Sequence, residues 1–389
     1  MSNGLEKYPK LRFPGFKEPW KATTLSAIFE KNMKKNCDGA IKNVICNSAK
    51  QGLIPQREYF DKDIANSDNT TGYYIIEQND FVYNPRKSAD APYGPISSYK
   101  YIDVGIVSPL YLCFRAKTEI NPHYYEWYFK SPAWHRYVYM AGDSGARHDR
   151  VSIKDNIFFA MPIHTPSKME QSQIASFLDT LEARIEKQCA LVESLKKYKR
   201  GLRQQVFPQK GETTPKLRFA GFTVPWEQHK VKNIAPLQRG FDLPTSQIEE
   251  GIYPVIMSNG IGGYHSHFKV KGPGIITGRS GTIGKLHYIE SDYWPHNTTL
   301  WITDFYGNNQ KFIYYMYQHL DLSRFSTGSG VPTLNRNDVH NELVWIPSVR
   351  EQERISEHLT NLDRLITLHQ RKLSKFQTLK SALLQQLFI

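Results

Sequence analysis

The chain has 389 residues, and 50 Lys and Arg against 37 Asp and Glu give it a net charge of +13 at neutral pH. This length supports two or three folded domains, and 40% hydrophobic with 13% aromatic residues excludes a disordered chain. No apolar run reaches the roughly 18–20 residues of a membrane span, and four cysteines without CxxC spacing exclude a disulfide scaffold. We expect a soluble, cytoplasmic protein without membrane association, whose charge favours a polyanionic partner.

A short aromatic lead near the start, Pro9–Trp20 (PKLRFPGFKEPW), recurs as Pro215–Trp226 (PKLRFAGFTVPW). Nine of its twelve positions are identical, at an offset of 215 − 9 = 206 residues. Such a repeat marks two homologous halves. We interpret the lead as a packing element built on its aromatic side chains, and direct contact with a ligand is the alternative.

The region after the first lead, 21–165, contains short apolar and aromatic runs divided by Asn, Asp, Gly and Pro, which predict strands. One aromatic stretch, His123–Val138, predicts a helix. The predicted strands are Tyr73–Ile76, Phe81–Tyr83, Val104–Val107 and Leu110–Phe114.

Each half ends in a segment with alternating apolar steps of three and four residues, which predicts a long helix. The two copies, Pro166–Phe207 and Pro347–Phe388, match without gaps at an offset of 347 − 166 = 181, and Ser167 and Ser348 are suitable N-caps. A helix of about 37 residues spans about 55 Å and needs a partner for its apolar stripe, so we expect an antiparallel pair. The predicted seam residues are Leu181, Ile185, Gln188, Val192, Leu195, Lys199, Leu362, Ile366, His369, Leu373, Phe376 and Lys380.

Polar residues interrupt the seam at equivalent positions of the two copies, Gln188 with His369 and Lys199 with Lys380. They are either tolerated substitutions or determinants of register. As determinants of register, they predict Gln188 opposite Lys380 and Lys199 opposite His369.

The second variable region, 227–346, repeats the mixed pattern, with an aromatic helical stretch at Gln310–Leu322. Its predicted strands are Tyr253–Met257, Gly274–Thr277, Leu286–Ile289 and Thr299–Thr303. The predicted fold is mixed α/β, with two strand-rich globules on two long antiparallel coiled-coil helices and a pseudo-twofold internal repeat. The predicted segments are the lead 1–20, globule 21–165, helix 166–207, linker and repeated lead 208–226, globule 227–346 and helix 347–389.

Several enzymatic motifs are absent from the sequence. No (Asp/Glu)-x-Lys tripeptide of a restriction-type nuclease occurs, and Asn84-Pro85-Arg86 does not fit the Asn/Asp-Pro-Pro-aromatic motif of adenine-N6 methyltransferases. Gly278–Leu286 (GRSGTIGKL) has the wrong spacing and end residue for a phosphate-binding loop. His265-Ser-His267 has no adjoining carboxylate or thiol cluster, so we expect no metal site. The chain is therefore predicted to be no enzyme by itself.

This order of parts resembles the specificity (S) subunit of Type I restriction-modification enzymes over nearly the whole chain. The second half carries GRSGTIGK (Gly278–Lys285) and GSGVPTLNRNDVHNELVWIPS (Gly328–Ser348), which are similar to elements of that family's target recognition domains. The first half departs from them with Asn84-Pro85-Arg86-Lys87 and a looser closing stretch, Gly142–Ile157.

The resemblance implies that each globule reads one half of a bipartite, asymmetric site in double-stranded DNA. It implies that the helices set the unread spacer and dock two methyltransferase subunits, and that two restriction subunits complete the complex. S-adenosylmethionine, ATP and magnesium are expected on those partners, with no cofactor on this chain.

Loop residues that can hydrogen-bond to bases or phosphates are the candidate DNA contacts, and the alternative for each is a solvated surface residue. A cationic cluster at 196–203 either follows phosphates or forms a solvated helix face. Rival functions are a coiled-coil scaffold whose globules bind RNA or protein, and an autonomous DNA enzyme with an unrecognised site. The candidate contacts are Arg86, Lys87, Arg147, His148, Arg150, Ser258, Asn259, Arg279, Ser280, Thr282 and Lys285.

Overall fold

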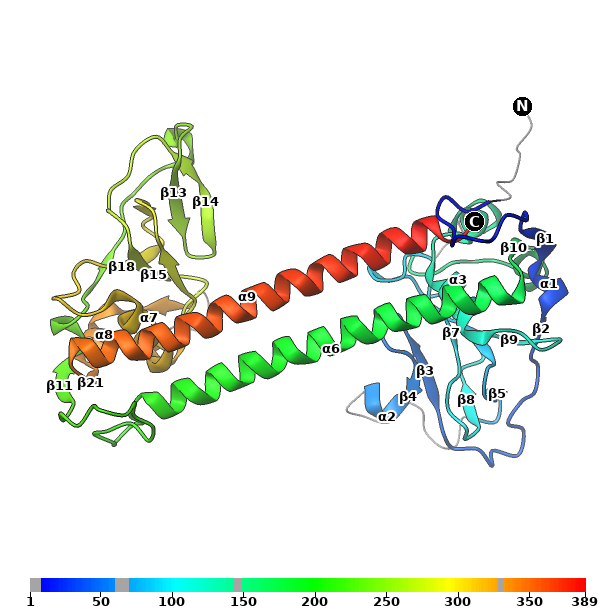
Figure 1. Cartoon of the computed structure of the whole chain (residues 1–389), viewed down its shortest axis with the longest axis horizontal. Coiled ribbons are helices and arrows are strands. Elements are labelled where there is room, and N and C mark those ends of the chain that lie inside the picture. The colour runs from blue at the N-terminus through cyan, green and yellow to red at the C-terminus, as the bar shows by residue number, and fades with distance from the viewer. Residues whose placement is uncertain (1–7, 60–69, 143–147, 328–331) are drawn as a thin grey trace. The chain divides into compact units, whose positions relative to one another are not determined.

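The chain forms two compact units. Unit 1 comprises Met1–Lys187 and Leu373–Ile389, and unit 2 comprises Gln188–Lys372. Each unit contains one globular module together with part of each of two long helices (Figure 1). Within the part of the chain that is described, no helix is both long and apolar enough to cross a membrane. The structure is a computed structural model that describes residues 8–59, 70–142, 148–327 and 332–389.

A four-stranded antiparallel sheet, with strand order β2–β9–β6–β7, forms the centre of the first module. Its core is aromatic because Phe29, Phe81 and Phe114 from three adjacent strands meet with ring centroids 5.3–5.6 Å apart. Helix α3 contacts β7, and its N-cap is Asn121, whose side chain accepts a hydrogen bond from the backbone N–H of Tyr124. The strands are β2 (Phe29–Lys31), β9 (Leu112–Ala116), β6 (Phe81–Tyr83) and β7 (Ile96–Ser98), and α3 is Pro122–Lys130.

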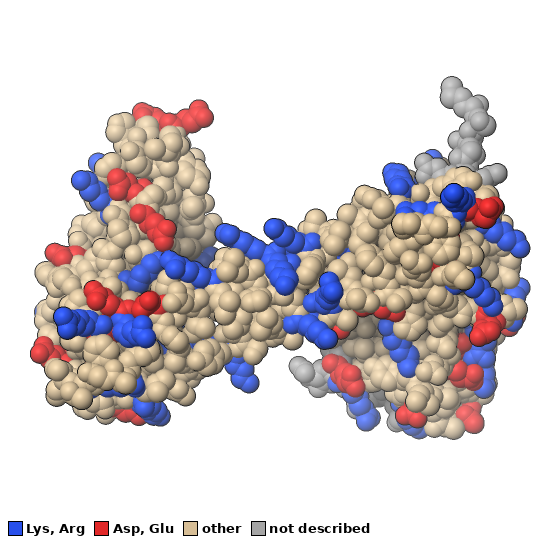
Figure 2. All heavy atoms as spheres, in the orientation of Figure 1, with Lys and Arg blue, Asp and Glu red and all other residues tan. Residues whose placement is uncertain are grey.

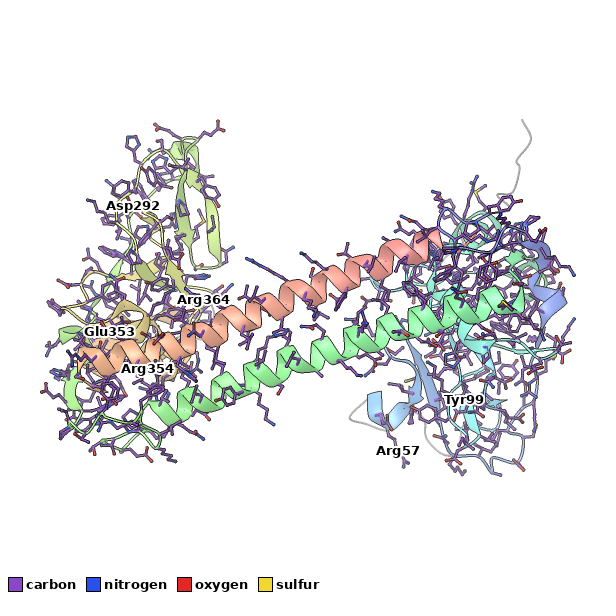
Figure 3. All side chains as sticks on the ribbon, in the orientation of Figure 1. Arg57, Tyr99, Asp292, Glu353, Arg354 and Arg364 are labelled. Atoms are coloured by element: carbon purple, nitrogen blue, oxygen red, sulfur yellow. The ribbon has the colours of Figure 1, made fainter. Side chains whose placement is uncertain are left out.

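Three further strand pairs complete this module. Strands β1 and β10 pair at its two ends, where it joins the lead and the first long helix, while β3–β4 and β5–β8 are also antiparallel. Tyr99, labelled in Figure 3, is fully buried here and donates a hydrogen bond to the carbonyl oxygen of Asp103. The remaining elements are β1 (Lys21–Thr24), α1 (Leu25–Ile28), β3 (Ile45–Ser48), β4 (Gly52–Pro55), α2 (Gln56–Tyr59), β5 (Tyr74–Ile76), β8 (Gly105–Val107), α4 (His135–Ala141), α5 (Asp155–Phe159) and β10 (Pro162–Thr165).

The second module repeats this plan. Its central sheet has the order β12–β18–β15–β16, and helix α7 contacts β15 and β16. Asn309 caps α7 as Asn121 caps α3. The central elements are β12 (Leu237–Arg239), β18 (Thr299–Ile302), β15 (Gly274–Gly278), β16 (Leu286–Ile289) and α7 (Gln310–Leu320). The others are β11 (Glu227–Lys230), η2 (Val231–Asn233), η3 (Thr245–Gln247), β13 (Tyr253–Met257), β14 (Gly260–His265), β17 (Trp294–Pro295), η4 (Leu322–Phe325), β19 (Ser326–Thr327), β20 (Thr333–Leu334), α8 (Arg336–Asn341) and β21 (Leu343–Ile346).

The predicted mixed α/β fold with an internal repeat is confirmed, and every predicted strand coincides with an observed strand to within two residues at each end. The single helix predicted over His123–Val138 is wrong. Helix α3 ends at Lys130 and α4 begins at His135, because Pro132 disfavours the helical conformation at Ser131. The sequence suggested one continuous helix because Trp134, which lies between α3 and α4, is also buried and continues the aromatic pattern.

The two long helices are α6 (Lys168–Val206) and α9 (Val349–Gln386), and they pack together antiparallel, as predicted. In unit 1 the start of α6 shares a core with the end of α9, where Ile185 and Leu383 are buried together. In unit 2 the end of α6 shares a core with the start of α9, through Leu202 and Leu359. All twelve predicted seam residues are buried or half-buried.

The predicted register of the polar seam residues is wrong. Gln188 lies against its own repeat equivalent, His369, and its Nε2 donates to Nδ1 at 2.8 Å and to the carbonyl oxygen at 3.0 Å. Lys199 instead binds Asp363 at 2.6 Å, and Lys380 binds Glu182 at 2.8 Å. Since 363 − 182 and 380 − 199 both equal 181, these two ion pairs are also repeat equivalents. Each lysine thus pairs with a carboxylate that flanks the seam on the partner helix. The prediction considered the polar residues of the seam alone, so it could not find these ion pairs.

Each lead is a packing element, as predicted. In unit 1 Arg12 makes two hydrogen bonds of 2.8 Å to the carboxylate of Glu170, which is only 1% exposed, and the buried Trp20 donates its indole N–H to the same group. In unit 2 Arg218 and Trp226 hold Glu351 in the same way, at 2.7–2.8 Å and 3.3 Å.

Each lead also contacts the end of the other long helix. The backbone N–H of Leu11 donates to the carbonyl oxygen of Gln386 at 3.0 Å, and Leu217 donates to Gln205 at 2.9 Å. A lead therefore fixes the first turn of one helix and the last turn of the other within each unit.

Candidate nucleic-acid interface

Loop 1 is the segment Asn84–Pro95 that connects β6 to β7 in the first module. Two backbone hydrogen bonds hold its start against Asp149–Val151. The N–H of Lys87 donates to the carbonyl oxygen of Asp149, and the N–H of Val151 donates to that of Pro85, both at 2.8 Å. Between them Arg86 and Arg150 form an isolated antiparallel bridge. The closing stretch therefore fixes the conformation of loop 1 where it leaves the sheet.

The bridge places two arginines opposite each other. Directly opposed like charges destabilise a strand pair unless an anion offsets them. Arg86 is exposed, and within the described ranges the side chain of Arg150 reaches the carboxylate of its neighbour Asp149, at 3.5 Å. The hydrogen bond from Arg150 lowers the pKa of the Asp149 carboxyl. The Nε of Arg150 is buried without a hydrogen-bond partner among the described residues. Among the described residues of this site, one carboxylate faces two guanidinium groups, which leaves an excess of positive charge.

Loop 2, Gly278–Lys285, connects β15 to β16 and is held in the same way. The N–H of Gly281 donates to the carbonyl oxygen of Pro332 at 3.1 Å, and the N–H of Leu334 donates to that of Arg279 at 2.8 Å. Ser280 and Thr333 form the isolated bridge between them. The sequence departure of the first half therefore conceals an equivalent backbone geometry.

Glycine is required where loop 2 begins. A Cβ on Gly278 would clash with the carbonyl oxygen of Thr282, and it would come within 3.3 Å of the Cβ of Ser258. Ser258 also donates its backbone N–H to the hydroxyl of Thr298 at 3.3 Å, and the N–H of Arg279 donates to the carbonyl oxygen of Thr298 at 2.8 Å. Loop 2 and the β13–β14 turn thus come together around Thr298.

Most predicted contacts lie on these two loops and their supports. Arg86, Lys87 and Arg150 are brought together in the first module, whereas Arg147 lies outside the described residues and His148 is exposed beside Asp149. In the second module Ser258 is half-buried beside loop 2, and Asn259 is exposed on the β13–β14 turn. The loop 2 residues Arg279, Thr282 and Lys285 are exposed, and Ser280 is half-buried.

Sequence reasoning missed residues that lie beside the loops. Asn47 is buried, donates its side-chain amide to the carbonyl oxygen of Val82, and accepts at its own carbonyl oxygen from the amide of Asn84. His287 lies on β16 beside Lys285, and its Nε2 is buried without a partner among the described residues. Burial and the charge of Lys285 lower the pKa of His287. Neither position belongs to a recognisable motif.

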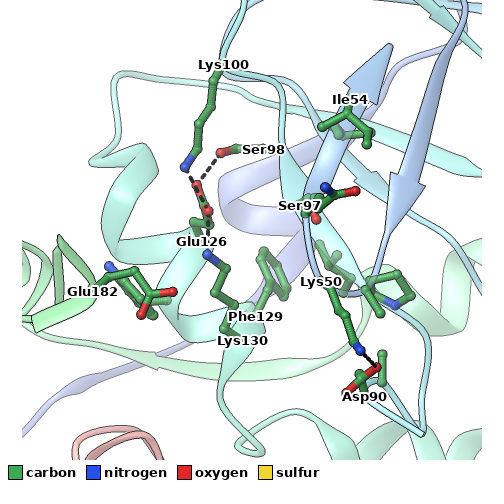
Figure 4. A pocket seen from close by; sticks show the side chains of 18 of the residues that line it. Lys50, Ile54, Asp90, Ser97, Ser98, Lys100, Glu126, Phe129, Lys130 and Glu182 are labelled. Carbon is green, nitrogen blue, oxygen red and sulfur yellow. Dashed lines mark hydrogen bonds and ion pairs between the residues drawn. The ribbon is translucent and has the colours of Figure 1, made fainter. Parts of the chain in front are cut away.

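A cavity of about 660 Å³ lies in unit 1 between the β3–β4 turn, loop 1, α3 and α6. Glu126 of α3 is buried in its wall, where Ser98 donates to its carboxylate at 2.7 Å and the ammonium groups of Lys130 and Lys100 lie at 2.8 and 3.1 Å (Figure 4). Burial raises the pKa of Glu126, but the charge of Lys130, the hydrogen bonds from Lys130 and Ser98, and the charge of Lys100 together lower it to about 2.

Glu126 should therefore make stability dependent on pH. Its folded pKa of about 2 lies below the unfolded value of 4.5, so its contribution is complete above about pH 4.5 and is lost as the pH falls towards 2. We expect Glu126→Gln to lower the free energy of unfolding by about 2–3 kcal/mol at pH 7 and by much less near pH 3. Urea unfolding at both pH values measures this, with the exposed Glu30→Gln as control. A pH-independent difference would contradict it.

Charge rather than metal chemistry characterises the described surface. Figure 2 shows Lys and Arg side chains over both modules and along the long helices. Among the residues that the structure describes, no group of three or more His, Cys, Asp or Glu is arranged to hold a metal ion. Paired modules with fixed loops and exposed cations are features of a class of proteins that bind polyanions.

The family model of the Type I restriction modification DNA specificity domain matches residues 17–194 and 223–377. The chain therefore belongs to the Type I restriction-modification DNA specificity family, whose role is DNA recognition. No curated protein matches the chain.

Solved structures show the same fold. The S subunit of a Type I restriction-modification system from M. genitalium has a TM-score of 0.61 at 16% identity, and the match covers 98% of this chain and 99% of that one. A chain from a study of complex assembly and conformational transition of the type I R-M system has a TM-score of 0.61 at 15% identity, covering 96% and 99%. The HsdS subunit from Thermoanaerobacter tengcongensis has a TM-score of 0.50 at 15% identity, covering 96% and 98%.

Proposed function

We propose that this chain is the non-catalytic specificity subunit of a Type I restriction-modification complex, and that each module reads one half of a bipartite, asymmetric site in double-stranded DNA. The fixed loop common to both modules supports this proposal. At equivalent bridge positions, the first module has Arg86 and Arg150, whereas the second has Ser280 and Thr333. Two loops with the same backbone geometry but different side chains are what the reading of two unlike half-sites requires.

The side chains on the loops suit direct readout. Arginine binds the O6 and N7 atoms of guanine with two hydrogen bonds, whereas serine and threonine bind several bases. Arg86 and Arg150 supply the first chemistry, and loop 2 supplies Arg279 together with hydroxyl groups. The glycines of loop 2 let the backbone approach phosphates closely.

The long helices are proposed to set the spacer and to dock two methyltransferase subunits. A helix of 39 residues is about 58 Å long. In unit 2 the exposed Leu191, Tyr198 and Leu365 each precede a seam residue, so they line one edge of the antiparallel pair, and Leu368 is exposed nearby. An exposed apolar edge is typical of a protein–protein interface. Two restriction subunits would complete the complex, with S-adenosylmethionine, ATP and magnesium bound by these partners rather than by this chain.

Arginine removal should affect one half-site at a time. We expect Arg86→Ala to relax or abolish recognition of the first half-site, and Arg279→Ala that of the second, at about 1–3 kcal/mol each. Filter binding of the chain with its co-expressed methyltransferase, on duplexes altered in one half-site, measures this. Equal weakening on all duplexes would instead identify a phosphate contact.

The same assay distinguishes the rival functions. A scaffold that binds RNA would bind single-stranded RNA more tightly than duplex DNA. A scaffold that binds protein would retain neither RNA nor DNA on the filter. An autonomous DNA enzyme would modify or cleave duplex DNA in the absence of the methyltransferase.

A further inference from the structure

Four cations form a basic ridge on α6 in unit 2. The segment 193–206 contains five cations, of which Lys199 faces the helix seam, and one carboxylate, Glu193, which binds Lys196 at 2.8 Å. Lys197 and Arg200 are exposed, and neither side chain has a hydrogen bond or ion pair within the described part of the chain. The ridge consists of Lys196, Lys197, Arg200 and Arg203.

The other long helix lacks this ridge. At the repeat offset of 181, the equivalents of Lys196, Lys197 and Arg200 are Gln377, Thr378 and Ser381, and that of Arg203 is Leu384. Both helices pack in the same way in their own units, so the ridge is not needed to build the helix pair. A solvated helix face would not require cations in one copy and neutral residues in the other.

The ridge leads towards loop 2. Arg203 donates to the side-chain oxygen of Gln318 on α7 at 3.1 Å. Burial and the charge of Arg200 lower the pKa of Arg203, while the nearby Asp321, next along from α7, raises it. Helix η4, which follows α7, lies beside loop 2. A Cβ on Gly284 of loop 2 would stand 3.2 Å from the Cβ and the backbone N of Ser323 in η4. The segment 318–325 therefore binds the ridge through Gln318 and approaches loop 2 through Ser323.

A further cation belongs to the same part of unit 2. Arg364 projects from α9 and is exposed (Figure 3), and its charge lowers the pKa of Lys311 on α7, after the larger effect of burial. Asp363 is already bound to Lys199 and Tyr315, at 2.6 and 2.7 Å. The nearest seam carboxylate is thus occupied by other partners. Glu193 offsets the charge of Lys196, and the ridge keeps the positive charges of Lys197, Arg200 and Arg203.

We propose that the basic ridge binds the phosphate backbone of the duplex held by loop 2, so that sequence-independent contacts accompany the second half-site alone. Duplex DNA is the occupant that fits best, because, among the described residues, four closely spaced cations outnumber the one carboxylate, Glu193, that pairs with them. Such an excess of cations matches a row of phosphates and releases counterions on binding. The inference rests on the proposed function and deepens it, since it predicts an electrostatic asymmetry between half-sites that the loops alone do not.

The repeat supplies the test variant. Lys196→Gln, Lys197→Thr and Arg200→Ser together install the residues found in the other helix, where they are compatible with the same packing. In the full chain with its co-expressed methyltransferase, we expect the slope of log K against log salt concentration to become less steep by about 2–3, at about 0.9 per phosphate contact. Ethylation interference should disappear from phosphates beside the second half-site, while base preference stays unchanged.

Two controls sharpen the result. Lys210→Ala, Lys230→Ala and Lys232→Ala remove the same charge from exposed positions outside the ridge and should leave the slope nearly unchanged. Gln377→Lys, Thr378→Lys and Ser381→Arg should create new interference beside the first half-site.

The outcomes separate the two proposals. If specific binding to the duplex persists with an unchanged slope and unchanged interference, the ridge proposal is wrong and the proposed function stands. If the ridge variant instead loses its methyltransferase on co-purification, the ridge binds an acidic protein surface and the proposal is overturned. If the unaltered chain shows no duplex specificity at all, the proposed function itself fails.

Discussion

One heptad inserted into each long helix should lengthen the unread spacer by about three base pairs and leave both half-sites unchanged. Insertions directly after Gln188 and directly before His369 face each other, because these residues bind each other across the pair. Seven residues add about 10.5 Å to a helix and keep the period of the seam. At about 3.4 Å per base pair this corresponds to three base pairs. The target of the co-expressed methyltransferase complex, read by methylation mapping, measures the change.

A mismatched insertion is the control for this experiment. Four residues in α6 alone break the register with α9, so we expect loss of binding rather than a new spacer. A heptad variant that retained the original spacer, or that changed a half-site, would contradict the role of the helices in setting the distance.

Arg12→Leu should destabilise unit 1 by about 3–5 kcal/mol. The substitution leaves the carboxylate of Glu170, 1% exposed, without its guanidinium partner, and an uncompensated buried charge costs about this much. The indole N–H of Trp20, at 3.4 Å, is too weak a replacement. Urea unfolding followed by tryptophan fluorescence measures the loss.

The double variant Arg12→Leu with Glu170→Leu is the matched control. It removes both charges and should recover most of the stability, since a buried ion pair can be replaced by apolar residues at little cost. Arg218→Leu should have a similar effect in unit 2, because Arg218 and Glu351 repeat the geometry. A loss below 1 kcal/mol for both single variants would show that the leads do not hold the helices.

The repeated parts of the fold could be predicted from the sequence. The lead and the long helices are recognisable because their patterns recur at fixed offsets and because a long apolar period has one structural solution. Short strands such as Phe81–Tyr83 were also predictable, since aromatic runs between turn residues are typical of buried strands.

The candidate site was only partly predictable, because it depends on contacts between distant segments. Nothing local shows that Arg86 faces Arg150 or that Ser280 faces Thr333. The Gly-rich sequence of loop 2 suggested a special geometry, whereas Asn84-Pro85-Arg86-Lys87 concealed the same one. The prediction of the helix register was wrong for a related reason. The seam lysines Lys199 and Lys380 pair with Asp363 and Glu182, which lie outside the predicted seam.

Methylome sequencing of a host that expresses this chain with its methyltransferase tests the central claim most directly. We expect one methylated motif with two different half-sites separated by a fixed number of unspecified base pairs. A contiguous motif, two identical half-sites or a variable spacer would contradict a protein whose two unlike modules read one duplex from a paired-helix frame.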